Sequence, residues 1–226
     1  MQSICLLFAG RGGLDDTNNR QSILRIPEVS RKIKEAQRLL DQTLDPSVHI
    51  DLFAFLNAPD NEFNSNTSLK SLVAATVQVG LFERLVKYRN RPEFLIGRNN
   101  GCSAMMVCAD LQSFEDFVLT SKYCKENTLM ARFTQQNSPL TGMEMEEFGS
   151  LQWNPDGYYE KKEVEKKQAA EILEEISTDH LIAQCIHVGP STESMERAIQ
   201  NQGLYNIASM NSIEIDPILN TFWKAS

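Results

Sequence analysis

The chain has 226 residues, enough for one large domain or two small ones, and its 42% hydrophobic and 23% charged residues are ordinary for a globular protein. A formal charge of -8 argues against a general nucleic-acid-binding protein, because such a protein needs a basic surface. The three histidines lie far apart in the sequence and the five cysteines form no C-x-x-C pair, so no metal site is predicted.

The cysteines and the first apolar run indicate the compartment in which the protein works. An odd number of cysteines, mostly inside apolar runs, is typical of buried free thiols in a reducing compartment. They are Cys5, Cys102, Cys108, Cys124 and Cys185. Residues 4–9 follow no basic residue and are too few for a signal peptide or a membrane span. We therefore expect a cytoplasmic protein that does not enter a membrane.

Residues 3–8 predict a strand buried on both faces, because they form an unbroken apolar run closed by glycines. The glycines that follow, Gly10, Gly12 and Gly13, allow a sharp turn and a close backbone approach to a ligand. They do not complete the G-x-G-x-x-G dinucleotide fingerprint, since no glycine stands at the third position of that motif. The two aspartates at 15 and 16 would also repel a pyrophosphate. No cofactor is predicted.

Two long helices are predicted next. Apolar residues recur at helical spacing over residues 27–44, at Val29, Ile33, Ala36 and Leu40. Residues 57–68 are rich in Asn, Asp and Ser and predict a loop, after which Ser68 caps a helix over residues 69–88. The apolar side of this second helix is formed by Leu72, Ala75, Val79 and Phe82.

Residues 92–109 predict a strand, a tight turn and a helix. Gly97 and Gly101 stand at the glycine positions of the G-x-S-x-G nucleophile elbow, in which a turn lifts one side chain above a parallel sheet. The position between them is Asn99, whose amide cannot attack a thioester as a serine alkoxide does. Asn100 followed by Gly101 is also typical of a two-residue hairpin. The elbow is favoured because residues 102–109 lack the alternation of a half-exposed strand.

The next part of the chain is less regular. Ser113, with acidic residues just after it, predicts the start of a helix. Residues 135–159 contain several prolines and glycines and predict irregular structure. Residues 160–176 predict a charged helix with a thin apolar stripe, whose charges form a solvated face.

The last part returns to alternating elements. Residues 180–188 predict a second buried strand, and Ser191 caps the helix that follows. Residues 204–210 predict a last strand, and Asp216 starts a C-terminal helix. The whole pattern predicts an α/β fold with a parallel sheet of about four or five strands and helices on both faces.

Several motifs occur in the order and spacing of a known family. Residues 8–12 read Phe-Ala-Gly-Arg-Gly, residues 97–101 read Gly-Arg-Asn-Asn-Gly, and residues 188–190 read Val-Gly-Pro. They resemble the F-P-G-Q-G, G-H-S-L-G and E-V-G-P-G motifs of malonyl-CoA:acyl carrier protein transacylases and of polyketide synthase acyltransferase domains. Residues 104–116 resemble the helix and the turn that follow the family's elbow, without a gap. The resemblance covers residues 1–130 and 178–226.

This resemblance implies an acyltransferase core, an α/β-hydrolase-like parallel sheet with helices on both faces, in a single domain over residues 1–226. Residues 131–177 are then a shortened replacement of the family's middle region, with its small ferredoxin-like subdomain missing or reduced. The implied partner is acyl carrier protein, a synthase module or another acyltransferase. No nucleic acid and no membrane are expected as partners, because of the net charge and the shortness of the first apolar run. A further possibility is a structural subunit that keeps the fold for assembly of an oligomer.

The departures from the family concern its catalytic residues. The nucleophilic serine falls on Asn99, the histidine before it on Arg98, the glutamine of the first motif on Arg11, and the arginine that holds the malonyl carboxylate near Cys124. The family's catalytic histidine lies in the middle region, where residues 131–177 contain no histidine. The degenerate site is therefore formed by Arg11, Gly97, Arg98, Asn99, Asn100, Gly101 and Cys124.

Two functions follow from these departures. The first is a catalytically inactive relative that acts as a binding or scaffold partner in fatty-acid or polyketide biosynthesis. The alternative is an active acyltransferase or acyl hydrolase with a rebuilt, non-serine site. Cys102 and Ser103 are its candidate nucleophiles, although small residues packed beneath the turn are the simpler interpretation. His187 ends a strand and is either a base that approaches the elbow or a partly buried strand-end histidine.

A basic cluster gives a candidate partner surface. It comprises Arg84, Lys87, Arg89, Arg91 and Arg98, with only Glu93 among them. An acidic carrier protein would be attracted to such a cluster, and the N-terminus of the elbow helix adds hydrogen-bond donors for a phosphate or a carboxylate. The other interpretation is a solvated basic helix end that balances nearby acids.

Overall fold

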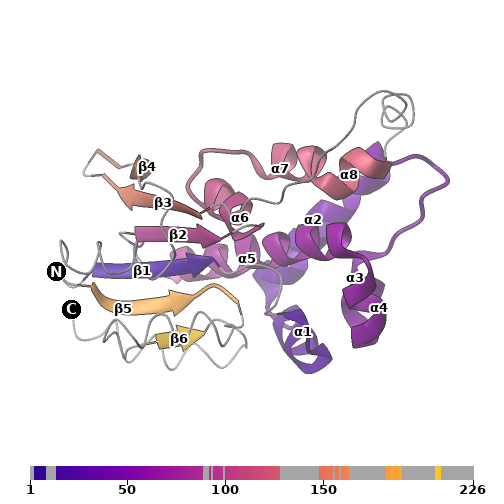
Figure 1. Ribbon diagram of the computed structural model, residues 1–226, viewed down its shortest axis with the longest axis horizontal. Coiled ribbons are helices and arrows are strands. Elements are labelled where there is room, and N and C mark those ends of the chain that lie inside the picture. Colours follow the sequence, from indigo (N-terminus) through magenta and orange to yellow (C-terminus); the bar gives the residue numbers. More distant parts are fainter. Residues whose placement is uncertain are drawn as a thin grey trace.

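The computed structural model describes residues 3–8, 14–88, 92, 94–98, 100–127, 148–154, 156–157, 159–162, 182–189 and 207–209. These residues form a six-stranded sheet whose strand order is β4-β3-β2-β1-β5-β6, with helices packed beside it (Figure 1). The strands are β1 (Ser3–Phe8), β2 (Phe94–Arg98), β3 (Phe148–Trp153), β4 (Tyr159–Lys162), β5 (Ile182–His187) and β6 (Ile207–Ser209). The helices are α1 (Thr17–Leu24), α2 (Pro27–Thr43), α3 (Leu52–Asn57), α4 (Asp60–Ser65), α5 (Thr67–Tyr88), α6 (Asn100–Cys108), α7 (Phe114–Thr120) and α8 (Lys122–Asn127).

The sheet is parallel at its centre and antiparallel at one side. Strand β1 pairs in parallel with β2 and with β5, and β6 continues the parallel part beyond β5. Strand β3 adds to β2 in antiparallel orientation, and β4 pairs with β3 in the same way. The predicted α/β fold with a parallel sheet and helices is confirmed, and the antiparallel pair is an addition that the sequence analysis did not predict.

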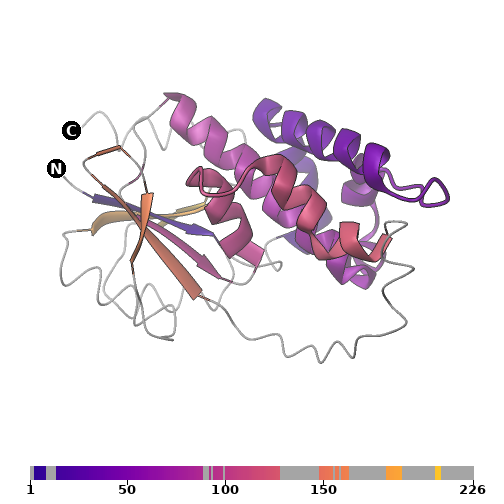
Figure 2. The ribbon, with the colours of Figure 1, turned by 90° about the horizontal axis from the view of Figure 1, so that it is seen from above.

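The two faces of the sheet are buried differently. Leu6, Phe8 and Leu95 belong to the main hydrophobic core with helices α5 and α6, and Figure 2 shows α5 on one side of the sheet. Leu7 and Ile96 alternate with these residues along the strands and are also completely buried, as expected for a parallel sheet covered on both faces. Among the described residues, the helices that pack on the sheet lie on the first of these faces.

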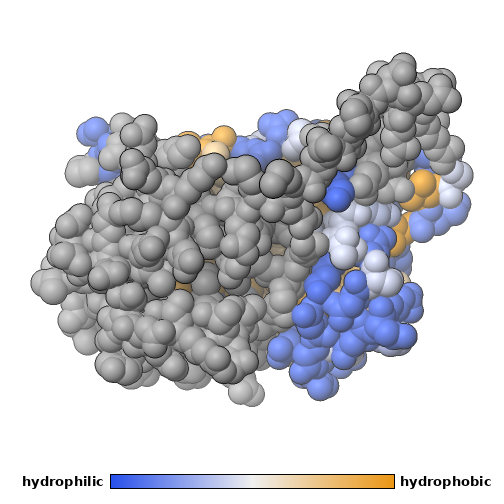
Figure 3. All heavy atoms as spheres, in the orientation of Figure 1, coloured by the Kyte–Doolittle hydropathy of each residue, from blue (hydrophilic) through white to orange (hydrophobic). Residues whose placement is uncertain are grey.

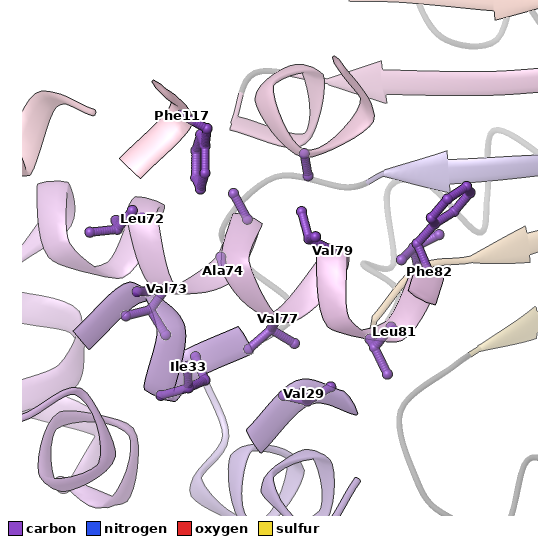
Figure 4. Packing of buried hydrophobic residues seen from close by; sticks show 14 of the residues in the cluster. Val29, Ile33, Leu72, Val73, Ala74, Val77, Val79, Leu81, Phe82 and Phe117 are labelled. Atoms are coloured by element: carbon purple, nitrogen blue, oxygen red, sulfur yellow. The ribbon is translucent and has the colours of Figure 1, made fainter. Parts of the chain in front are cut away.

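Helix α5 is buried on all sides over residues 72–82. The prediction placed four apolar residues on one side of this helix, but α2 and α6 cover it from different directions (Figure 4). Gly80 makes this possible, because it lets α5 approach α2 so closely that a Cβ atom there would lie 2.6 Å from the Cα atom of Val29. A helix that is apolar all round is typical of such a central position.

Most predicted elements are present, with some corrections at their ends. The predicted helix over residues 27–44 is α2, and Val29, Ile33, Ala36 and Leu40 are all fully buried. The helix predicted from Ser68 begins at Thr67, and the Oδ1 atom of Asn66 accepts a 3.0 Å hydrogen bond from the Leu69 amide. The Ser113 cap is confirmed by a 2.9 Å hydrogen bond from the Asp116 amide to its Oγ atom.

Three parts of the prediction were wrong. The expected loop over residues 57–68 contains α4, which is anchored by the fully buried Phe63. The expected irregular segment over residues 135–159 contains β3, and the expected charged helix begins instead as strand β4. The charged residues of β4 suit this strand because it lies at the edge of the sheet within the described residues. The remainder of that expected helix, and the helices expected from Ser191 and Asp216, lie outside the described residues.

Candidate functional site

The strand and the helix predicted on either side of Asn99 are present. Strand β2 ends at Arg98 and helix α6 begins at Asn100, so a single residue separates them. Strand β2 pairs in parallel with β1 at Gly97 and Phe8, which excludes the hairpin interpretation of Asn100 and Gly101. Asn99 itself lies outside the described residues.

Gly97 is required by the geometry of this turn. A Cβ atom at Gly97 would lie 2.8 Å from the Cα atom and 2.9 Å from the amide nitrogen of Cys102. Both distances are shorter than those that real Cβ atoms adopt, and both are to backbone atoms that cannot rotate away. The first turn of α6 therefore packs directly on the end of β2, as expected for a strand-to-helix elbow.

The parallel strands bring other candidate residues to the same edge of the sheet. Strand β1 has β2 on one side and β5 on the other, so the strand order reverses at β1. At such a topological switch point, α/β proteins bind ligands outside the carboxyl ends of the strands. His187 is the last residue of β5, lies beside Leu7 and Ser209 in the strand register, and is fully buried. Because β1 separates β5 from β2, His187 lies roughly 10 Å from the elbow strand at the usual strand spacing.

The two candidate nucleophiles are partly accessible. Cys102 and Ser103 lie in the first turn of α6 and are partly exposed, whereas Gly101 and Ala104 on either side of them are buried. The first turn of a helix offers free backbone N–H groups, which favour negative charge nearby. This part of the elbow helix therefore combines solvent access with a favourable position for an anion.

Cys124, near which the sequence resemblance aligns the family's carboxylate-binding arginine, has a buried thiol. Cys124 lies in α8, which packs on α5 and α7, and it is fully buried. Burial raises the pKa of its thiol, and burial together with the nearby Cys124 raises the pKa of Tyr123. Both groups are therefore neutral near pH 7.

The basic cluster is divided in the structure. Arg84 is 8% exposed, and its Nη1 atom lies 3.3 Å from the Oε2 atom of Glu28 in the first turn of α2. Lys87 is exposed, and its Nζ atom lies 3.1 Å from the other carboxylate oxygen of Glu28. Arg98 ends β2 at the carboxyl edge of the sheet, whereas α5 ends before β2 begins. The charge of Arg84 is therefore paired with Glu28 inside the protein. Arg98 lies apart from Arg84, at the other end of β2.

Glu28 is a charged residue that the sequence analysis did not single out. Burial raises the pKa of its carboxyl, but hydrogen bonds from its own amide, Lys87 and Arg84 outweigh burial and hold the pKa below its ordinary value of 4.5. The signal for it was weak, since an acid after a helix-initiating proline is a common N-terminal feature. Glu28 fixes the last turns of α5, the helix that leads into the elbow strand.

Tyr159 is a second residue that supports this region and that was not predicted from the sequence. Its hydroxyl donates a 2.6 Å hydrogen bond to the Pro92 carbonyl just before β2, and the residue is 1% exposed.

Arg11, Arg89 and Arg91 lie outside the described residues, and for Arg98 and Asn100 only the backbone is described. In the described part of the chain, no helix is long and apolar enough to cross a bilayer. Among the same residues, no three His, Cys, Asp or Glu side chains lie close enough together to hold a metal ion.

Comparison with solved structures identifies the fold. The malonyl-CoA:acyl carrier protein transacylase of Coxiella burnetii matches with a TM-score of 0.63 at 14% identity, over 99% of this chain and 98% of its own. FabD of Acinetobacter baumannii matches with a TM-score of 0.62 at 14% identity, over 100% and 99%. The acyl carrier protein S-malonyltransferase of Vibrio cholerae gives 0.59 at 12%, over 96% and 100%. The sequence matches no family model and no curated protein. The chain therefore has the acyltransferase fold of these proteins.

Proposed function

We propose that this chain is a catalytically inactive acyltransferase-like protein that binds a partner in fatty-acid or polyketide biosynthesis. The observation that carries the proposal is the close packing of β2 on α6, on either side of a position that the sequence fills with an amide. Gly97 still packs against Cys102, while the sequence places Asn99 where the turn would present a nucleophile. The nitrogen lone pair of an amide side chain is delocalised into its carbonyl group, so Asn99 is a poor nucleophile.

The buried Cys124 supports the same conclusion from the binding side. A neutral thiol in an apolar setting cannot hold a malonyl carboxylate as an arginine fork does. We further propose that residues 1–226 form one domain, in which residues 131–177 replace the family's middle region. The proteins with this fold named above act on acyl carrier protein, so a carrier protein is the partner that we propose first.

Titration calorimetry with phosphopantetheinylated acyl carrier protein tests this function. We expect saturable binding to the wild-type chain, and the same affinity for an Asn99→Ala variant, because the proposed binding forms no covalent bond to residue 99. As a control, the carrier protein is titrated into buffer alone. Absence of binding at low ionic strength would remove the carrier protein as the partner, and a synthase module or another acyltransferase would be tested next.

A second candidate function is an acyltransferase or hydrolase with a rebuilt site, and the partial exposure of Cys102 favours it. A thiolate in the first turn of a helix is a competent nucleophile. Incubation with an acyl-CoA followed by peptide mapping tests this candidate. An acyl group on Cys102 or Ser103, lost in the Cys102→Ala or Ser103→Ala variant respectively, would support it, and an unmodified peptide 99–110 would exclude it.

A further inference from the structure

Arg20 is a charged side chain that lies completely inside the protein. It belongs to α1 and is 0% exposed. Its Nε atom donates to the Leu56 carbonyl at 2.8 Å, and its Nη2 atom donates to the Ala58 carbonyl at 2.6 Å. These are carbonyls at the C-terminal end of α3, which have no partner inside their own helix and carry partial negative charge. Arg20 therefore closes the end of α3.

The same guanidinium holds the segment before α1. The Nη1 atom donates to the carbonyls of Leu14 and Asp15 at 2.8 and 3.0 Å. The Nη2 atom also donates to Thr17 Oγ1 at 2.9 Å and to Asp60 Oδ1 at 3.0 Å. Every guanidinium nitrogen is thus engaged, which a lysine could not reproduce because its three donors radiate from one atom.

Phe63 and Lys70 complete the arrangement. The Cζ atom of Arg20 lies 4.2 Å from the centre of the Phe63 ring, and the Nζ atom of Lys70 lies 5.6 Å from the same centre. Lys70 also forms an ion pair with the Asp15 carboxylate and donates to Asn64 Oδ1 at 2.6 Å. Asp15 is therefore held twice, through its carbonyl by Arg20 and through its carboxylate by Lys70.

The location of this cluster relates it to the candidate site. Leu14 and Asp15 are the first described residues after Phe8, which ends β1 at the carboxyl edge of the sheet. Helices α1, α3 and α4 lie beyond the carboxyl ends of β1 and β2, and their outer surface is hydrophilic (Figure 3). Because Arg20 fixes Leu14 and Asp15, it determines the position of the chain after the carboxyl edge of the sheet, where α/β folds bind ligands.

We propose that Arg20 is a positioning residue for ligand binding at the carboxyl edge, acting through Leu14 and Asp15. The proposal rests on the proposed function for its ligand, but the restraint on Leu14 and Asp15 is independent of it. The pattern here is specific to a planar fork, since its acceptors come from α3, α4 and the residues before α1.

Hydrogen exchange on the full chain tests the restraint. Arg20→Lys is compared with Ile23→Val, a change at a buried residue of the same helix, with denaturant adjusted until both variants have equal free energies of unfolding. We expect amides of residues 6–17 to exchange several-fold faster in Arg20→Lys. Equal exchange in the two variants would overturn the proposal. If Arg20→Lys does not fold, Asp60→Asn replaces it, because this change weakens an acceptor of the Arg20 guanidinium and the Asp60 side chain is 54% exposed; a smaller increase in the same amides is expected, and no increase would overturn the proposal.

Binding of phosphopantetheinylated acyl carrier protein tests the effect on the site. A displacement of about 1 Å in a positioning element can cost an enzyme about a hundredfold, so we expect binding to Arg20→Lys to weaken on the order of tenfold relative to Ile23→Val. Faster exchange with unchanged affinity would overturn the role in ligand binding. If the wild-type chain binds no carrier protein, the proposed function fails, whereas the exchange comparison still decides the restraint.

Discussion

Gly80 of α5 and Val29 of α2 meet backbone to backbone, since a Cβ atom on Gly80 would lie 2.6 Å from the Cα atom and 3.0 Å from the amide nitrogen of Val29. Helix–helix packing distances depend on the side chains at the contact, and glycine gives the shortest approach. The ion pairs of Glu28 with Arg84 and Lys87 lie next to this contact on the same two helices. Together they fix the end of α5, from which the chain runs to the elbow strand.

A Gly80→Ala variant is expected to be less stable than the wild type. Alanine would gain about 1 kcal/mol in helix propensity, but overpacking against backbone costs about 1–3 kcal/mol and forces the two helices apart. We expect a net loss in the free energy of unfolding, measured by urea denaturation. Lys34→Ala on the exposed face of α2 is the matched control and should change stability little. A stabilisation of about 1 kcal/mol, which is the full gain in helix propensity, would contradict the close contact.

Glu28 predicts a pH dependence of stability. Its pKa in the folded protein lies below its ordinary value of 4.5, so the unfolded chain binds a proton more readily than the folded one. The stabilisation is complete above about pH 4.5 and is lost as the pH falls through the folded-state pKa. In Glu28→Gln, we expect lower stability at pH 7 by about 3 kcal/mol, because buried Arg84 loses its partner, and a weaker decline in acid. An identical decline in both proteins would exclude this role.

Much of the fold could be predicted because its signals are local. The runs that form β1 and β5 are apolar and closed by glycines, and α2 has a clear helical period. The misses come from contacts between residues far apart in the sequence. Strand β3 is defined by its pairing with β2, and α4 depends on one phenylalanine among polar residues. Composition alone assigns such segments to loops.

The location of the candidate site could be predicted from the sequence, but the residues that hold its elements in place could not. The elbow could be located from the glycines at 97 and 101, because a turn of this kind leaves a glycine signature. The partners of Arg20 and Glu28 lie up to 40 and 59 residues away, so their burial and pairing could not be derived from spacing. For the same reason Arg84 was assigned to a surface cluster although it is buried.

Restoring the nucleophile alone should not restore acyl transfer. In Asn99→Ser, a serine without a base keeps its proton at neutral pH. His187 is separated from the elbow strand by β1, which makes it a poor base for this position. We expect no malonyl transfer above the wild-type background in a radiolabelled malonyl-CoA assay. Measurable transfer by the single variant, abolished by adding His187→Ala, would show that His187 is a base after all.

Carrier protein binding through the remaining basic residues should depend on salt. Because Arg84 is buried against Glu28, we restrict the proposed docking surface for the body of the carrier protein to the region of Lys87, Arg89 and Arg91 before β2, from which its phosphopantetheine arm would extend to the carboxyl edge of the sheet. Exposed charges are screened beyond about 8 Å at physiological ionic strength, so affinity should fall steeply as salt rises. Arg89→Glu/Arg91→Glu should weaken binding strongly. Lys34→Glu/Arg38→Glu changes the net charge equally on α2, and equal affinities of the two double variants would remove this surface.

Intact-mass analysis tests most directly whether this chain performs acyl transfer. The wild-type chain is incubated with malonyl-CoA and phosphopantetheinylated acyl carrier protein, and the masses of both proteins are compared with a mixture that lacks the chain. We predict unmodified masses for the chain and no malonyl-carrier beyond the control. A malonyl adduct on the chain, or malonylation of the carrier protein that requires the chain, would contradict the proposal that it is catalytically inactive.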